Sequence, residues 1–176
     1  MSVVKELIRT EANGTISFGN YELDKKSKLS DFEHDGDMYK VKTYNEITKL
    51  ERNGMFVYES VPGTTVLNLE VVEDGMSFLV EGEKDAQITV ELEEDTEYAI
   101  TIDHVEVGKM KTNLGGKLSI SVELEQSEQL AVKIKKMKKK HKCKNIPGLI
   151  VPVIFLWRKM YGKRKEECFF LSELWL

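Results

Sequence analysis

The stretch from His34 to Asp37 gathers groups that could bind a hard cation. It reads His34-Asp35-Gly36-Asp37, and carboxylates spaced around a glycine can supply oxygen ligands to Ca²⁺. The same residue types are those that a hairpin turn requires, because Asp and Gly adopt the backbone conformations of tight turns. We favour the turn, so no metal site is predicted here.

Carboxylates and histidines elsewhere give a weak case for acid and base catalysis. Two carboxylates about 5–10 Å apart can hydrolyse a glycosidic bond, and an acidic chain offers such pairs by chance. The densest acidic run, ELEEDTEY at residues 91–98, is typical of a charged strand end followed by a turn. His104 lies where a hairpin turn is expected, with no second histidine nearby, which indicates an exposed side chain. We therefore predict no catalytic constellation and no cofactor.

Aromatic residues with charged neighbours are the better candidates for binding. Tyr44, Arg52, Tyr58 and Glu59 could form a contact surface for a sugar or a peptide, since tyrosine combines an apolar ring with a polar hydroxyl. Strand alternation would place Phe56 and Tyr58 on one face, either displayed together or buried together. Burial in the core is the interpretation that we favour for these rings.

The elements that must position these residues are strands. Turn dipeptides recur at Asn13-Gly14, Asp35-Gly36, Asn53-Gly54 and Asp74-Gly75, each beside β-forming residues. Apolar residues alternate with polar ones between the turns, which is typical of half-buried antiparallel strands. The alternating segments are 39–43, 67–71, 76–80, 88–92, 98–102, 118–124 and 130–134. The pattern predicts an all-β antiparallel sandwich, immunoglobulin-like or jelly-roll-like, with about ten strands; the N-terminal VVKELIRTE could be a strand or a short helix, and we favour the strand.

Charge divides the chain into two parts of opposite sign. Residues 1–130 hold 13 Lys and Arg against 27 Asp and Glu, whereas the remaining 46 residues hold 13 against 3. Both cysteines and both tryptophans also lie beyond residue 136. We therefore predict an acidic domain at residues 1–136 and an atypical tail at 137–176. An acidic domain repels phosphate backbones, so nucleic acid is not an expected partner.

The tail has three interpretations. Lysines crowd residues 133–144, and a twelve-residue apolar run at 146–157 follows them with two prolines inside it. That run is too short to span a bilayer alone, but it could contact a membrane surface through its lysines. The abrupt change of composition favours a read-through, a frameshift or a fused reading frame over membrane contact or a nucleic-acid hook. With no signal peptide visible at the N-terminus, a cytoplasmic location is expected by default.

Three stretches carry a resemblance to a known family. They are GTISFGNYELDKKSKLSDFEHDGDMYKVKT, NEITKLERNGMFVYESVPGT and DTEYAITIDHVEVGKMKTNLGGKLSISVEL. Over about residues 1–136 the chain resembles small proteins of clostridial gut bacteria (Firmicutes) that are often named endosialidases. The last stretch also resembles the closing strands of immunoglobulin-like sandwiches attached to carbohydrate-active proteins.

The family name implies a sialidase-type site. Such a site would use Tyr58 as nucleophile, Glu59 to activate it and a cluster of arginines to bind the sugar carboxylate. Adjacent residues of a strand point to opposite faces, however, and residues 1–136 contain only Arg9 and Arg52. These two facts argue against the enzyme.

The prediction is therefore a non-enzymatic binding or structural module whose ligand is a carbohydrate or a protein. A small carbohydrate-active hydrolase using Glu59 and Tyr58 is the first alternative, and an adaptor tethered to a membrane through residues 137–176 is the second. Antiparallel sandwiches also have unpaired edge strands, through which the chain could form a homo-oligomer.

Overall fold

All secondary structure in the described part of the chain is antiparallel β. The structure is a computed structural model that describes residues 3–125 and 129–137. Its strands are β1 (Ile8–Thr10), β2 (Ile16–Phe18), β3 (Ser27–His34), β4 (Asp37–Tyr44), β5 (Ile47–Arg52), β6 (Met55–Val61), β7 (Thr65–Val72), β8 (Gly75–Glu81), β9 (Ala86–Glu91), β10 (Glu97–Ile102), β11 (Val105–Lys111), β12 (Lys117–Val122) and β13 (Leu130–Lys136).

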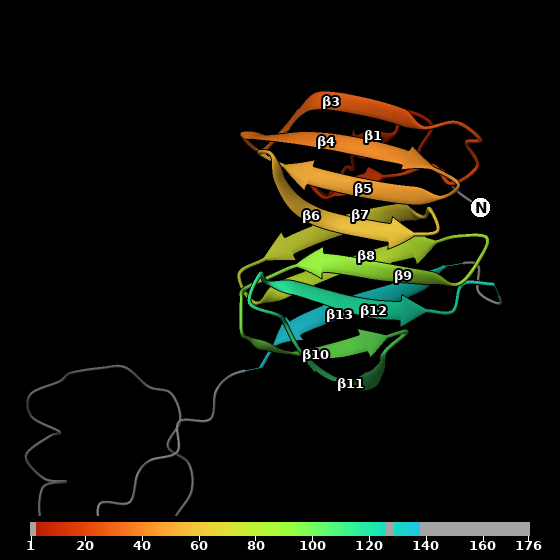
Figure 1. Ribbon diagram of the computed structural model, residues 1–176. Coiled ribbons are helices and arrows are strands. Elements are labelled where there is room, and N and C mark those ends of the chain that lie inside the picture. The colour runs from red at the N-terminus through yellow and green to blue at the C-terminus, as the bar shows by residue number, and fades with distance from the viewer. Residues whose placement is uncertain (1–2, 126–128, 138–176) are drawn as a thin grey trace, which may run out of the picture. The chain divides into compact units, whose positions relative to one another are not determined.

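Two sheets form the layers of a β-sandwich (Figure 1). One sheet has seven strands in the order β1-β2-β7-β8-β13-β10-β11, and the other has six in the order β12-β9-β6-β5-β4-β3. The chain crosses between the layers several times, for example from β6 to β7 and from β8 to β9. The predicted all-β sandwich is confirmed, with thirteen strands in place of about ten.

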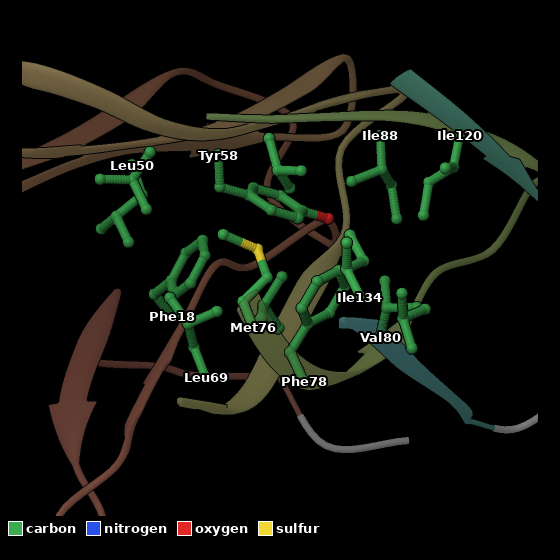
Figure 2. Close-up of a cluster of buried hydrophobic side chains, with 14 of the residues drawn as sticks. Phe18, Leu50, Tyr58, Leu69, Met76, Phe78, Val80, Ile88, Ile120 and Ile134 are labelled. Atoms are coloured by element: carbon green, nitrogen blue, oxygen red, sulfur yellow. The ribbon is translucent and has the colours of Figure 1, made fainter. Parts of the chain in front are cut away.

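The core lies between the sheets and follows the predicted alternation closely. Tyr98 and Ile100 on β10 and Val132 and Ile134 on β13 are each at most 1% exposed, as the spacing of apolar residues predicts. Figure 2 shows side chains of both sheets interdigitating around the rings of Phe18, Tyr58 and Phe78. Removal of this apolar surface from water supplies the main driving force for folding.

Among the β-bulges of the two sheets, those in β6 and β7 change which side chains of the predicted segments face the core. At Asn68, with φ of 52°, the register of β7 against β8 shifts, so Leu69 joins the core cluster while Leu67 lies outside it. At Val57 the register of β6 against β5 shifts, so Val57 and Tyr58 are both buried. The predictions of one shared face for residues 67–71, and of one for Phe56 and Tyr58, are therefore wrong, because a bulge adds one residue to the period.

The turns largely agree with the dipeptides that predicted them. Asp35-Gly36 and Asn53-Gly54 each have two consecutive positive φ angles, as a two-residue hairpin turn of the favoured hand requires. Asp103-His104 forms the same turn without a glycine, and His104 is exposed as predicted. Before β8 the turn is shifted by one residue, since Val72 pairs with Gly75 across Glu73 and Asp74.

The described residues include the expected N-terminal strand but only the first residue of the predicted tail. The expected N-terminal strand is present only as Ile8–Thr10. The last strand ends at Lys136, and apart from Met137 the predicted tail lies outside the described residues. Within residues 3–125 and 129–137 no helix is long and apolar enough to cross a membrane.

Candidate binding cleft

The four residues expected to form a binding surface do not lie together. Tyr44 and Arg52 are at opposite ends of the β4–β5 hairpin, since Tyr44 pairs with Ile47 beside the turn while Arg52 pairs with Tyr39. Glu59 is half-buried opposite Lys49 and Thr89, whereas Tyr58 is fully buried in the core. The structure therefore separates this set into different environments.

Tyr58 has the surroundings of a structural residue. Its ring packs edge-to-face against Phe18 and Phe78, with centroids 5.4 and 5.7 Å away, and its hydroxyl lies 2.9 Å from Thr64 Oγ1 (Figure 2). Burial raises the pKa of the phenol above its usual range, which disfavours the phenolate that a nucleophile would need. The geometry does not support the nucleophilic role that the family resemblance implies for Tyr58.

The raised pKa of Tyr58 predicts a loss of stability in alkali. In the unfolded chain the Tyr58 phenol has a pKa of about 10, whereas in the folded chain burial raises its pKa. Below about pH 10 the phenol is neutral in both states and its contribution to stability is complete. As pH rises further, the phenol ionises in the unfolded chain first, so this contribution is lost. The free energy of unfolding should fall more steeply above about pH 10 in wild type than in Tyr58→Phe, by up to about 1.4 kcal/mol per pH unit. Urea titrations across about pH 9–11 measure it, and parallel pH profiles would contradict it.

A buried network of hydroxyl groups surrounds the end of the Tyr58 side chain. Thr64 Oγ1 also lies 2.8 Å from Ser60 Oγ, and the Thr64 carbonyl accepts a 2.7 Å hydrogen bond from Thr48 Oγ1. Thr48 Oγ1 is in turn 2.8 Å from Thr43 Oγ1. This network holds the β6–β7 crossing against the six-stranded sheet. The sequence does not indicate this network, because Ser and Thr are mostly exposed in folded proteins.

A cleft at the open end of the β4–β5 hairpin, opposite its turn, is lined by Arg52 and the His34–Asp37 turn. Its volume is about 230 Å³, and both sheets contribute to its walls. Polar side chains line most of it: Asn13, Thr15, His34, Asp35, Asp37, Tyr39, Arg52 and Glu70. This cleft, called the His34–Arg52 cleft below, brings Arg52, one of the predicted binding residues, together with the His34–Asp37 turn.

Hydrogen bonds between neighbours hold the polar groups of the His34–Arg52 cleft in place. His34 Nδ1 lies 3.0 Å from Thr10 Oγ1, and the His34 ring is edge-on to the Tyr39 ring at 6.1 Å. Asp37 Oδ1 accepts a 2.6 Å hydrogen bond from Asn53 Nδ2, and Asp37 Oδ2 is 3.8 Å from Arg52 Nη1. Groups oriented in this way lose little conformational freedom when a ligand binds.

The acids of the His34–Asp37 motif serve the turn and its neighbours. Asp35 Oδ2 is 3.4 Å from His34 Nε2, and Asp37 contacts Asn53 and Arg52. The interpretation of this motif as a hairpin turn is confirmed by the positive φ angles of Asp35 and Gly36. In the part of the chain that the structure describes, no three His, Cys, Asp or Glu side chains gather as metal ligands do.

Two larger clefts contain neither Arg52 nor the His34–Asp37 turn. One, of about 370 Å³, lies beside Tyr21, Glu46 and the cis Val61-Pro62 bond. Its Glu46 carboxylate already accepts a hydrogen bond from the Tyr44 hydroxyl, and Tyr21 is only 7% exposed. The other, of about 340 Å³, includes Phe78 among its lining residues, but that ring is 3% exposed and packs in the core.

Known proteins give no independent guide to the function. The chain matches no family model, no curated protein and no solved structure. The resemblance to proteins named endosialidases therefore stays a prediction.

Proposed function

We propose that the chain is a non-enzymatic binding module and that the His34–Arg52 cleft binds a carbohydrate. The observation that supports this most is the set of planar polar groups in one cleft, because guanidinium, carboxylate, amide and imidazole groups match the paired hydroxyls of a sugar. At about 230 Å³ the cleft is smaller than most small-molecule sites, which fits one sugar unit or a chain end.

The charge of the cleft favours a neutral sugar over an acidic one. Asp35, Asp37 and Glu70 supply three carboxylates, against the single guanidinium of Arg52. A sialic acid carboxylate would meet more negative than positive charge, whereas neutral hydroxyls can donate to the carboxylates and accept from Arg52. The proposed ligand therefore differs from the substrate that the family name implies.

Binding without turnover fits the placement of Tyr58 and Glu59. Tyr58 is buried, and Glu59 lies on a strand of the six-stranded sheet without lining the His34–Arg52 cleft. A hydrolase acting in this cleft would have to use its own acids, Asp35, Asp37 and Glu70, in place of Tyr58 and Glu59. Release of a new reducing end from a bound glycan by the 176-residue chain would favour the hydrolase over the binding module.

Replacing Arg52 by alanine should weaken sugar binding about 10- to 100-fold, because hydrogen bonds from a charged donor are about twice as strong as neutral ones. A glycan array identifies the ligand for the full chain, and calorimetric titration then compares the variant with wild type. Arg52 pairs with Asp37 only at the surface, so its removal should leave the fold intact.

Arg9→Ala is the matched control. Arg9 is the other arginine of residues 1–136; it pairs with Glu11 at 2.8 Å and does not line the cleft. Its affinity should equal that of wild type. Equal affinity of wild type and Arg52→Ala, or retention of no sugar on the array, would contradict the proposal.

A further inference from the structure

Strand β11 is an edge strand with unusual apolar exposure. It ends the seven-stranded sheet, and Val105, Val107 and Met110 are 64, 57 and 41% exposed. Edge strands of soluble proteins are usually protected, because their unpaired backbone groups attract other strands. An exposed apolar edge is therefore a candidate interface.

A bulge determines which way the side chains of β11 point. Val105 pairs with Ile102 and Met110 pairs with Tyr98, so both lie on the inner face of the sheet. Glu106 pairs with Thr101 and Lys109 with Ala99, which places them on the outer face. The register shift leaves Val107 as the extra residue beside Gly108. The bulge thus puts residues 105 and 110, and residues 106 and 109, on common faces despite their odd separations.

The free edge of β11 exposes the backbone groups of particular residues. The pair Ile102 and Val105 closes the turn Asp103-His104, so the backbone groups of Val105 bond to those of Ile102 on β10. Along an antiparallel strand, the backbone groups of successive pairs alternate between bonding to this neighbour and pointing away from it. The bond from Thr112 N to Thr96 O, 3.0 Å long, fixes the same alternation at the other end of the hairpin. The backbone N–H and C=O groups of Glu106, Lys109 and Lys111 therefore point to the free edge.

Charge and the position of the bulge together select one way for this edge to pair with a second copy. If Glu106 lies opposite Lys109 of the other copy, a two-fold axis repeats the same opposite-charge pair. The two bulges then meet at the axis, so they stay in register with each other, and Val105 lies opposite Met110. Registers that place Lys109 opposite itself or opposite Lys111 bring like charges together, which is unfavourable. A register with Glu106 opposite Lys111 pairs opposite charges, but it places Lys109 opposite Gly108, whose backbone groups bond inward to Ile100, so the hydrogen bonds of the new pair are interrupted. Neither Glu106 nor Lys109 forms an ion pair with any other described residue.

We propose that two copies of this chain pair antiparallel through β11 and continue their seven-stranded sheets across a two-fold axis. The pairs of Glu106 with Lys109 specify the register, and Val105 with Met110 supplies apolar contact on the inner face. No side chain blocks the approach at Gly108, where an added Cβ would meet nothing within 4 Å. This proposal is independent of the sugar-binding cleft, which β11 does not line.

Charge reversal tests the register. Analytical ultracentrifugation of the 176-residue chain should show a monomer–dimer equilibrium, and either Glu106→Lys or Lys109→Glu should raise the dissociation constant about tenfold. The double variant with both reversals should return to near the wild-type value, because each pair is restored with its charges exchanged. Glu33→Lys, on the edge strand β3 of the other sheet, is the matched control and should behave as wild type.

Three results would overturn the proposal. They are a chain that stays monomeric at every concentration, a dimer that neither single reversal weakens, and a double variant that is no stronger than the single ones. Circular dichroism of each variant separates a lost interface from a lost fold.

Discussion

Tyr58→Ala should lower the free energy of unfolding by about 3–5 kcal/mol, the range measured for removing a large buried aromatic ring. The ring lies between Phe18 and Phe78 at the centre of the core, so its loss leaves a cavity that the surrounding strands cannot fill (Figure 2). The hydroxyl network would also lose one of the two side-chain partners of Thr64 Oγ1. Chemical denaturation followed by circular dichroism measures the change.

Tyr58→Phe is the matched variant for the hydroxyl alone. It keeps the ring and removes only the hydroxyl with its hydrogen bond to Thr64, so its cost should be about 1 kcal/mol at neutral pH. If Tyr58→Ala were as stable as Tyr58→Phe, Tyr58 would not be a core residue, and its role in binding or catalysis would have to be reconsidered.

Gly75→Ala should cost roughly 3–5 kcal/mol, because it combines backbone strain with a steric clash. Gly75 has φ of 147°, and a Cβ added to it would lie 1.9 Å from the carbonyl oxygen of Ile134. Relief of that clash would require β8 and β13 to separate, although Gly75 pairs with Lys135 between these central strands. Thermal unfolding of the variant measures the loss.

At concentrations where the chain is a monomer, Gly108→Ala isolates the contribution of the clash. Gly108 has φ of 153°, close to that of Gly75, but an added Cβ there meets nothing within 4 Å. The strain alone should cost about 1–3 kcal/mol. Equal losses in the two alanine variants would contradict the predicted contact between residue 75 and the Ile134 carbonyl.

The sequence predicts the strands that alternate regularly and fails where a bulge intervenes. Tyr98 and Ile100 follow the two-residue period, so their burial could be predicted without any knowledge of their partners. Val57 and Asn68 sit at bulges, which arise because the paired strands differ locally in length and twist, and one strand's sequence does not contain that information. The error at Val57 led directly to the prediction that Phe56 and Tyr58 share a face.

The candidate cleft could be predicted only in part. Residue types and spacing point to the His34–Asp37 turn and to Arg52 separately, but nothing in the sequence indicates that β3, β4 and β5 bring them to one end of the sandwich. Pairing of Tyr39 with Arg52 produces that proximity, and strand register is a tertiary property. Glu70 and Asn13 come from the opposite sheet, so their contribution depends on how the two layers pack.

The most direct test is a nuclear magnetic resonance titration of the 176-residue chain with the glycan that it retains on an array. The account predicts that amide shifts change at the residues of the His34–Arg52 cleft, around positions 13–15, 34–37, 52–53 and 69–71, while the glycan signals show no new reducing end. Shift changes centred elsewhere, for example beside Tyr44 or along β11, would contradict the site. Appearance of a cleaved glycan would contradict the conclusion that the chain binds its ligand without turning it over.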